Sequence, residues 1–438
     1  MNTEQTGRAP SAIARVVPAL LVAIVLAACS ASTPPSPTNA PSTAGASTAV
    51  SSGGTSSTPA GNLQPVTMNV GRFPKGAAAA FVTQYMINNH LIEDAGQTLG
   101  LNITVNWSNQ ANATSVAQAM LGTTLDIGPM GSSAYVGLIA QNQAVTPISI
   151  AEGHFKFVLA VQKTSPIHSL ADLKGKTVGT ITGSDLYNVL AEMLLAQFGS
   201  ADPATDGVQI ANISSVPQLA TVPAGTDATI VTIPSFLQAQ ALGLPVTAVV
   251  DSYGMSEDAY NGPEGQGAGH IITSAQSSPF WPDGFYGHRA VFIARDAFLQ
   301  QNPKAVEAFL IAQNKAIQAI QGMDPQAVAS IVASDWGIVP ATGQQIVKDD
   351  LLVQRGFTFI TEGDAAVLSL QSQLAAQAGS IASPVGWDAL KAALLKGADV
   401  SKAAYDALGD QPADSVFLDT SKDVRGYPTW EATSWKTH

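Results

Sequence analysis

Short apolar segments alternate with longer amphipathic ones from residue 65 to residue 250. The amphipathic segments repeat hydrophobic positions at helical spacing, as Leu190, Met193 and Leu194 do within Ser184–Phe198. This alternation predicts mostly parallel sheets with helices on their faces. The predicted strands are Val66–Val70, Leu101–Trp107, one within Leu125–Ser133, Val145–Ile150, Phe155–Gln162, Thr177–Thr180, Val208–Ile213, one within Gly225–Ser235, Val246–Val250 and Arg289–Ala294.

One pattern occurs twice, in Leu125–Ser133 and in Gly225–Ser235. In both, an aspartate (Asp126 or Asp227) precedes a buried strand, a loop with glycine or proline, and the start of a helix. The repeat is short, but it fits two lobes of similar plan.

Helices dominate the last third of the chain. Asn302 and Pro303 form a helix start by capping and by proline in the first turn, and an apolar face continues to Ile320. Residues 324–396 are predicted to be helical in pieces, and the tail from residue 411 has no clear periodicity. Asp251–Ala268 is rich in Gly, Pro and acidic residues, and we interpret it as an insert.

The N-terminus has the order of a secretory signal. Arg8 and Arg15 precede the apolar segment Val16–Ala28, which is shorter than the ~20 residues that a membrane-spanning helix needs. It ends in Leu-Ala-Ala followed by Cys29, which resembles the bacterial lipobox, where the cysteine is acylated. Residues 1–28 are therefore predicted to be a lipoprotein signal peptide, with lipidation at Cys29 and anchoring at the extracytoplasmic face of the cell membrane.

The segment after the cysteine is predicted to be a tether. Ser30–Gln64 has no charged residue and is dominated by Ser, Thr, Pro, Ala and Gly. It has too little apolar surface to offset the entropy lost on ordering, so residues 29–64 should be a flexible spacer. Cys29 is the only cysteine, which rules out an intramolecular disulfide and a cysteine cluster that holds a metal.

Charge and motif content exclude several function classes. The net charge is −12 and no cluster of Lys and Arg stands out, so nucleic acid is not an expected partner. The six histidines lack metal-ligand spacing and no Gly-X-Ser-X-Gly motif is present, so we expect no metal, cofactor or catalytic residue. A triad assembled only by folding would leave no such spacing, so an enzyme stays open as an alternative.

The segment Ser169–Asp185 carries the clearest family signal. It predicts a helical turn, a tight turn at Lys174–Lys176, the strand Thr177–Thr180, a glycine loop and a helix that opens at Ser184. Its Asp-Leu-Lys-Gly-Lys-Thr-Val-Gly run resembles a segment of solute-binding proteins of bacterial ABC importers, in the nitrate/sulfonate/taurine branch. The loop at Asp126 and the passage Ala294–Phe309 are similar to the same family.

The resemblance implies a two-lobed type II periplasmic-binding fold, α/β in class, with a mostly parallel sheet flanked by helices in each lobe. Residues 65–152 would form the first part of lobe 1 and residues 153–287 lobe 2. Residues 288–438 would supply a return strand, helices that pack back on the lobes, and a tail. The family also implies a monomer that binds a small organic solute between its lobes and delivers it to a membrane permease.

Ligands of open α/β sheets bind at the carboxyl ends of the strands. The loops predicted there contain glycines and hydroxyl side chains beside helix starts, one cation and one aromatic residue. For each, an ordinary structural role is the alternative: capping for the serines and threonines, a solvated loop charge for the cation, core packing for the aromatic residue. The candidates are Arg72, Gly131, Ser132, Ser133, Thr182, Gly183, Ser184, Thr232, Ser235 and Tyr286.

Asp185 is the last candidate, and two interpretations of it stay open. A carboxylate in the first turn of a helix is stabilised by the helix dipole, so Asp185 could simply cap its helix. If it faces the cleft instead, it would repel nitrate or a sulfonate and would suit a ligand with an amine or a ring N–H. The ligand class, whether sulfonate, taurine, nitrate or a heterocycle, therefore stays open.

The sequence thus favours a lipid-anchored solute-binding protein of an ABC importer. The alternatives are an extracellular enzyme on a two-lobed scaffold and a ligand-sensing lipoprotein that acts on a receptor. A histidine or carboxylate with a strongly shifted pKa beside a nucleophile would favour the enzyme.

Overall fold

The structure is a computed structural model of the 438-residue chain. It describes residues 63–77, 79–152, 157–251, 288, 290–349, 360 and 362–408, all within the second of two units, 1–58 and 59–438. The predicted signal peptide, Cys29, nearly all of the tether and of the insert, Tyr286 and the tail lie outside the described residues.

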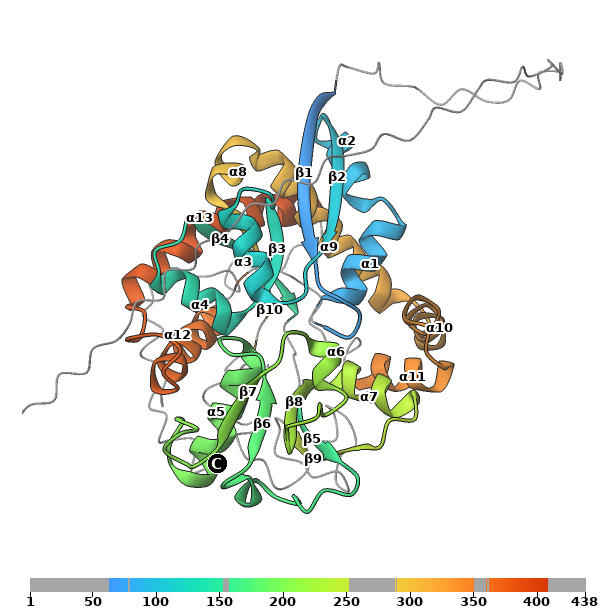
Figure 1. The fold of residues 1–438 in the computed structure, drawn as a ribbon. Helices are drawn as coiled ribbons and strands as arrows, with labels where there is room; N and C mark the ends of the chain where they lie inside the picture. Colours follow the sequence, from blue (N-terminus) through green and yellow to red (C-terminus); the bar gives the residue numbers. More distant parts are fainter. Residues whose placement is uncertain are drawn as a thin grey trace, which may run out of the picture. The chain divides into compact units, whose positions relative to one another are not determined.

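The first sheet has five strands in the order β2-β1-β3-β10-β4 (Figure 1). The central part is parallel: β1 (Gln64–Arg72) pairs with β2 (Leu101–Asn109) and with β3 (Ile127–Gly131). The return strand β10 (Ala290–Arg295) is antiparallel to β3 and to β4 (Val145–Glu152), which makes the sheet mixed. We call this sheet and the helices on it lobe 1.

The second sheet repeats this arrangement in the order β7-β6-β8-β5-β9. Here β6 (Thr177–Thr180) is parallel to β7 (Gln209–Asn212) and β8 (Ala228–Thr232). Strand β5 (Phe157–Gln162) is antiparallel to β8 and to β9 (Val246–Asp251). Each lobe thus has one strand that runs against its centre, β10 or β5. We call the second sheet and its helices lobe 2.

The repeated aspartates have the same structural role in both lobes. Asp126 Oδ2 accepts hydrogen bonds from the backbone N–H of Asn69 at 3.0 Å and from its side chain at 2.9 Å. Asp227 Oδ2 accepts one from the Thr177 backbone N–H at 2.8 Å. Each carboxylate ties the start of a central strand to its parallel neighbour: Asp126, just before β3, binds Asn69 of β1, and Asp227, just before β8, binds Thr177 of β6.

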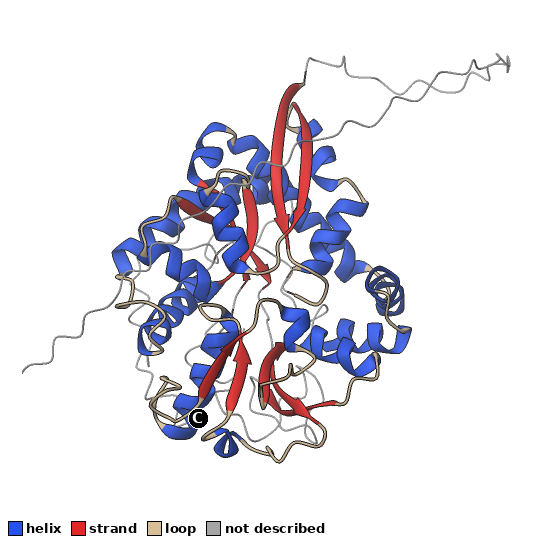
Figure 2. Cartoon of the chain, in the orientation of Figure 1, coloured by secondary structure: helices blue, strands red, loops and turns tan. Residues whose placement is uncertain are grey.

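Helices cover the sheets (Figure 2). The C-terminal helices reach both lobes: α12 packs on α4 and α5, α11 packs on α7, and α13 packs on β4 and α9. The helices are α1 (Ala80–Asn88), α2 (Leu91–Thr98), α3 (Ala113–Leu121), α4 (Ser132–Ala140), the 3-10 helix η1 (Leu170–Leu173), α5 (Asp185–Phe198), α6 (Val216–Leu219), α7 (Ile233–Ala241), α8 (Asp296–Gln301), α9 (Pro303–Gly322), α10 (Pro325–Trp336), α11 (Pro340–Asp349), α12 (Glu362–Gln377) and α13 (Trp387–Leu408).

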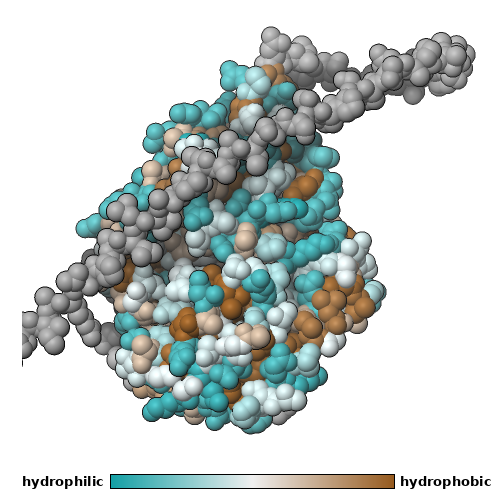
Figure 3. Space-filling model, viewed as in Figure 1, coloured by the Kyte–Doolittle hydropathy of each residue, from teal (hydrophilic) through white to brown (hydrophobic). Residues whose placement is uncertain are grey.

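Apolar residues on the face drawn in Figure 3 occur in separate patches among polar ones. Exposed large apolar side chains in the described part of the chain include Leu242 at the end of α7 and Val339 just before α11. Single exposed apolar side chains are ordinary on protein surfaces, so they do not by themselves mark a binding surface.

Candidate ligand-binding site

Strand β3 of lobe 1 runs directly into α4, because the helix begins at Ser132 one residue after the strand ends. The first N–H groups of a helix have no partner within the helix, and the helix dipole gives this end a partial positive charge. The N-terminus of α4 is therefore suited to a negatively charged group.

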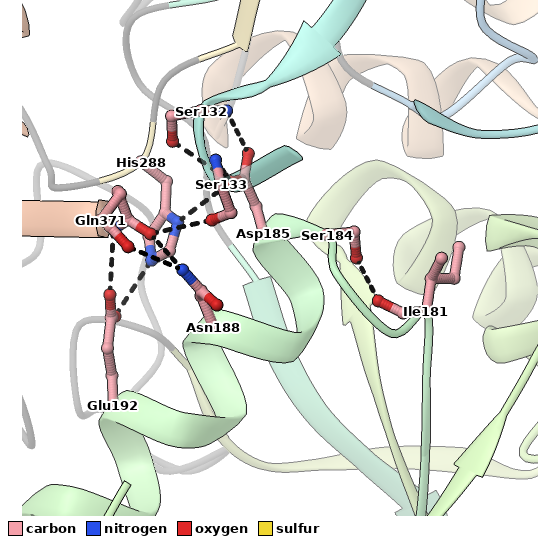
Figure 4. A network of polar contacts seen from close by, with 9 residues as sticks. All are labelled: Ser132, Ser133, Ile181, Ser184, Asp185, Asn188, Glu192, His288 and Gln371. Atoms are coloured by element: carbon pink, nitrogen blue, oxygen red, sulfur yellow. Dashed lines mark hydrogen bonds and ion pairs between the residues drawn. The ribbon is translucent and has the colours of Figure 1, made fainter. Parts of the chain in front are cut away.

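The carboxylate of Asp185, from lobe 2, occupies this position (Figure 4). Its Oδ2 accepts a hydrogen bond from the Ser132 backbone N–H at 3.1 Å. Its Oδ1 accepts one from the Ser133 backbone N–H at 2.7 Å and one from Ser132 Oγ at 3.2 Å. Asp185 is only 3% exposed and is the first residue of α5. The carboxylate therefore lies at the N-termini of two helices at once.

Gly131 makes this close approach possible. A Cβ atom at position 131 would lie 2.2 Å from Asp185 Oδ2, far inside van der Waals contact. Only glycine lets the end of β3 and the carboxylate come this close.

Two further contacts cross between the lobes. The hydroxyls of Thr232 and Ser235 both donate to the backbone carbonyl of Gly76, at 2.7 and 3.1 Å. The side-chain amide of Asn112 donates to the Ser214 carbonyl at 2.9 Å. Gly76 has a φ of 80°, in the left-handed region that favours glycine.

A cavity of about 50 Å³ lies among these three contacts. About 10–15 Å³ is enough for one water molecule, so the cavity holds a few waters or a solute of a few heavy atoms. Among the residues that the structure describes, four polar ones line it, Asn112 from lobe 1 and Ser184, Asp185 and Thr232 from lobe 2. The remaining lining residues are Gly131 and seven apolar ones, Phe73, Ala77, Ala111, Ala113, Ile181, Leu186 and Val216.

A buried polar network extends from Asp185 away from this cavity (Figure 4). Gln371 on α12 joins the lobes, because its Oε1 accepts from Ser133 Oγ of lobe 1 at 2.9 Å and from Asn188 Nδ2 of lobe 2 at 2.9 Å. Its Nε2 donates to Glu192 Oε1 at 3.1 Å. All four side chains are at most 5% exposed.

His288 lies between two carboxylates in this network. Its Nε2 is 3.0 Å from Glu192 Oε2 and its Nδ1 is 3.9 Å from Asp185 Oδ1. Burial alone would lower the pKa of His288, but the negative charge of Glu192 and the Asp185 carboxylate outweigh it and raise the pKa to about 9. The imidazole is therefore positively charged at neutral pH.

The structure brings several of the predicted site residues together. Gly131, Ser184, Asp185 and Thr232 line the cavity. Three more adjoin it through cross-lobe hydrogen bonds, namely Ser132, Ser133 and Ser235.

Other candidates lie elsewhere. The guanidinium of Arg72 donates to Asn109 Oδ1 at 2.8 Å and to Gln84 Oε1 at 2.6 Å, and Arg72 does not line the cavity. The backbone N–H and hydroxyl of Thr182 both donate to Asn212 Oδ1, at 2.9 and 3.0 Å. Gly183 has a φ of 75° in the turn before α5 and is likewise not a lining residue.

Sequence reasoning missed other members of the site. Asn112 caps α3, and its side-chain amide also reaches lobe 2, a contact that the sequence does not indicate. Gly76 had a detectable signal, since it follows the Pro-Lys pair after the first strand. For His288 and Gln371 the sequence carries no signal that we can identify.

Within the described ranges, no group of three or more His, Cys, Asp or Glu residues is placed to hold a metal ion. No helix among those same residues is long and apolar enough to cross a membrane.

Residues 89–219, which span parts of both lobes, match the family model described as "ABC transporter, phosphonate, periplasmic substrate-binding protein". No curated protein sequence matches the chain.

Solved structures are similar over most of the chain. The alkanesulfonate-binding protein SsuA from Xanthomonas axonopodis pv. citri, bound to MOPS, has a TM-score of 0.56 at 15% identity and covers 76% of this chain and 98% of its own. The nitrate-binding protein NrtA from Synechocystis PCC 6803 has a TM-score of 0.57 at 15% identity and covers 80% and 90%. The fold is that of the periplasmic solute-binding proteins.

The predicted resemblance and the two-lobed α/β fold class are thereby confirmed, with each sheet mixed rather than wholly parallel. The family model describes substrate-binding proteins, and both structural neighbours are substrate-binding proteins rather than enzymes.

Proposed function

We propose that this chain is the lipid-anchored, extracytoplasmic solute-binding protein of an ABC importer. It binds a small organic solute between its lobes and presents the closed form to a membrane permease. The observation that carries the proposal is the cavity among three cross-lobe contacts, lined by residues at or near the carboxyl ends of strands in both sheets. A ligand held there contacts both lobes only when they are closed, so ligand shifts the chain towards closure.

The match of residues 89–219 to a substrate-binding family supports this proposal, as does the similarity of fold to sulfonate- and nitrate-binding proteins. The lipobox-like Cys29 supports an anchored form, and the uncharged segment 30–64 provides the spacer that such a form needs. We propose that the chain acts as a monomer.

One observation bears on the enzyme alternative, namely the raised pKa of His288. His288 has the shifted pKa that would favour it, but His288 does not line the cavity, and the ionisable groups that the structure describes beside it, Glu192 and Asp185, are carboxylates. A base buried behind the cavity cannot reach a substrate in it, so the geometry favours binding without chemistry.

The test begins with the ligand that the protein itself selects. The full chain is purified from its own membranes, and small molecules released by denaturation are identified by mass spectrometry. We expect one compound that binds saturably in calorimetry and is recovered unchanged after long incubation. Conversion of that compound would instead support an enzyme.

Transport and anchoring are then measured in cells. Deletion of the gene should abolish uptake of the compound, and Cys29→Ser should release the protein from the membrane fraction. Normal uptake in the deletion strain would refute the importer role and favour a sensor that acts on a receptor.

A further inference from the structure

Asp185 places a negative charge of the protein itself at the position where this site could otherwise hold an anion. We propose that the cleft selects small solutes without an anionic group, either neutral or cationic and with a largely apolar body. Nitrate, sulfonates and phosphonates are therefore excluded. This inference deepens the proposed function by naming its ligand class.

The first argument is that the N-termini of α4 and α3 are already used, and that α5, which also begins at the cavity, carries the Asp185 carboxylate in its own first turn. The N-terminus of α4 binds the Asp185 carboxylate through two backbone N–H groups and one hydroxyl. The N-terminus of α3 is capped by the side chain of Asn112, which accepts from the Ser115 N–H at 3.0 Å. Pro234 in the first turn of α7 has no N–H to donate.

The second argument is electrostatic. Among the described residues that line the cavity there is no Lys, Arg or His, and the one charged side chain is Asp185. An anion in the cavity would have no counter-charge among these residues and would lie beside a buried carboxylate. Two like charges repel far more strongly in a buried site than in water, because the local dielectric is low.

The third argument is that the other polar side chains of the lining are engaged within the protein. Ser184 Oγ donates to the Ile181 carbonyl at 2.6 Å, and Thr232 Oγ1 donates to the Gly76 carbonyl. The amide of Asn112 is bound at both of its ends. The described lining therefore presents an apolar wall and a carboxylate to a solute. The two carboxylate oxygens together have about four acceptor positions, and three of them are used by Ser132 and Ser133.

Donor groups surround the Asp185 carboxylate. Its oxygens accept three hydrogen bonds, and the Nδ1 atom of His288 lies 3.9 Å from Oδ1. A solute that donates a hydrogen bond or bears a positive charge complements this arrangement.

The first arm of the test uses the wild-type full chain and no variant. Melting temperatures are measured with methanesulfonate, methylphosphonate, nitrate and the neutral dimethyl sulfone, which is close to methanesulfonate in shape. We expect the three anions to shift the melting temperature no more than sodium chloride does at the same ionic strength. A saturable rise with any of the three would overturn the proposal.

The second arm opens the position that Asp185 occupies. In Asp185→Ala the Ser132 and Ser133 N–H groups lose their partner, so the planar oxyanions formate and nitrate should now bind there. We expect a saturable rise of roughly 2–5 °C in the variant and none in wild type. Absence of that rise in a folded Asp185→Ala protein would contradict the assignment of this position to an anion.

Asp324→Ala is the matched control. The Asp324 carboxylate also accepts backbone N–H bonds at a helix N-terminus, from Gln326 and Ala327 of α10, and it does not line the cavity. With formate or nitrate, the melting temperature of Asp324→Ala should rise no more than it does with sodium chloride at the same ionic strength. If Asp185→Ala does not fold, the wild-type arm decides the proposal by itself.

The outcomes also separate this inference from the proposed function. If Asp185→Ala gains anion binding but the wild-type protein converts its natural ligand, the proposed function is refuted and the inference about the ligand class stands. If uptake of methanesulfonate depends on this protein, the proposed function stands and the inference about the ligand class is refuted.

Discussion

The carboxylate of Asp185 and the backbone N–H of Ser133 are joined by a 2.7 Å hydrogen bond that crosses from lobe 2 to lobe 1. Because the bond exists only when the lobes are together, it contributes to the closed state directly. Charge-assisted hydrogen bonds of this kind contribute about 1.5–3 kcal/mol each. Part of the free energy that favours closure is therefore built into the chain rather than supplied by a ligand.

Gly131→Ala should disrupt this contact without changing any charge. The new methyl group would lie 2.2 Å from Asp185 Oδ2, so the carboxylate or the end of β3 must move. We expect a loss of about 1–3 kcal/mol in the free energy of unfolding, as for other overpacked sites. Small-angle scattering should show a larger radius of gyration if the lobes separate.

Gly137→Ala, in the helix α4 that follows Gly131, is the control. A Cβ atom there meets nothing within 4 Å, so the substitution should be neutral or stabilising by up to about 1 kcal/mol. Equal effects of the two substitutions would mean that contact with Asp185 does not determine the cost.

Thr232→Val and Ser235→Ala should be strongly coupled. Both hydroxyls donate to the buried Gly76 carbonyl, so either single variant leaves that carbonyl one donor. We expect each single change to cost about 0.5–1.5 kcal/mol, and the double variant to cost more than their sum, because a buried acceptor then loses both partners. A double-mutant cycle in urea measures the coupling.

The matching control is Thr229→Val, since Thr229 Oγ1 donates to the Leu219 carbonyl at 2.9 Å wholly within lobe 2. It should lower stability by a similar amount and show no coupling to Ser235→Ala. Additive behaviour of Thr232→Val and Ser235→Ala would indicate that the Gly76 carbonyl finds another donor, such as water.

Much of the fold could be predicted because the spacing of apolar residues along the chain depends on the local helix or strand. The predicted strand Arg289–Ala294 corresponds to β10 at Ala290–Arg295, and the helix that starts at Asn302–Pro303 corresponds to α9. The repeated Asp-led strands at Asp126 and Asp227 proved to be equivalent in the two sheets. The local spacing of apolar residues and the helix-capping residues were sufficient to predict these elements.

The partners of the site residues could not be predicted in the same way. Asp185 and Ser132 are 53 positions apart, and Gln371 is 238 positions from Ser133. Periodicity shows which face of a helix is buried, but it does not show what the opposite lobe presents there. Arg72 illustrates the limit, because the sequence places a cation at the end of a strand but does not show that its guanidinium donates to Gln84 and Asn109.

Stability should fall as pH rises from about 6.5 to about 9, because of His288. Its pKa is raised from 6.5 to about 9 in the folded chain, so the folded state binds the proton more tightly than the unfolded state does. The stabilisation is complete below the unfolded pKa and is lost as pH rises through the folded pKa. The difference between 6.5 and about 9 corresponds to roughly 3 kcal/mol, measurable as the free energy of unfolding in urea at each pH.

His288→Gln tests whether this residue is responsible. The variant removes the positive charge between Glu192 and Asp185, so it should be less stable than wild type at pH 6.5 and nearly equal to it above pH 9. His168→Gln, which changes an exposed histidine, should retain the wild-type pH profile. If His288→Gln kept the same decline between pH 6.5 and 9, another group would have to bind the proton, and the carboxylates around His288 would not hold an imidazolium.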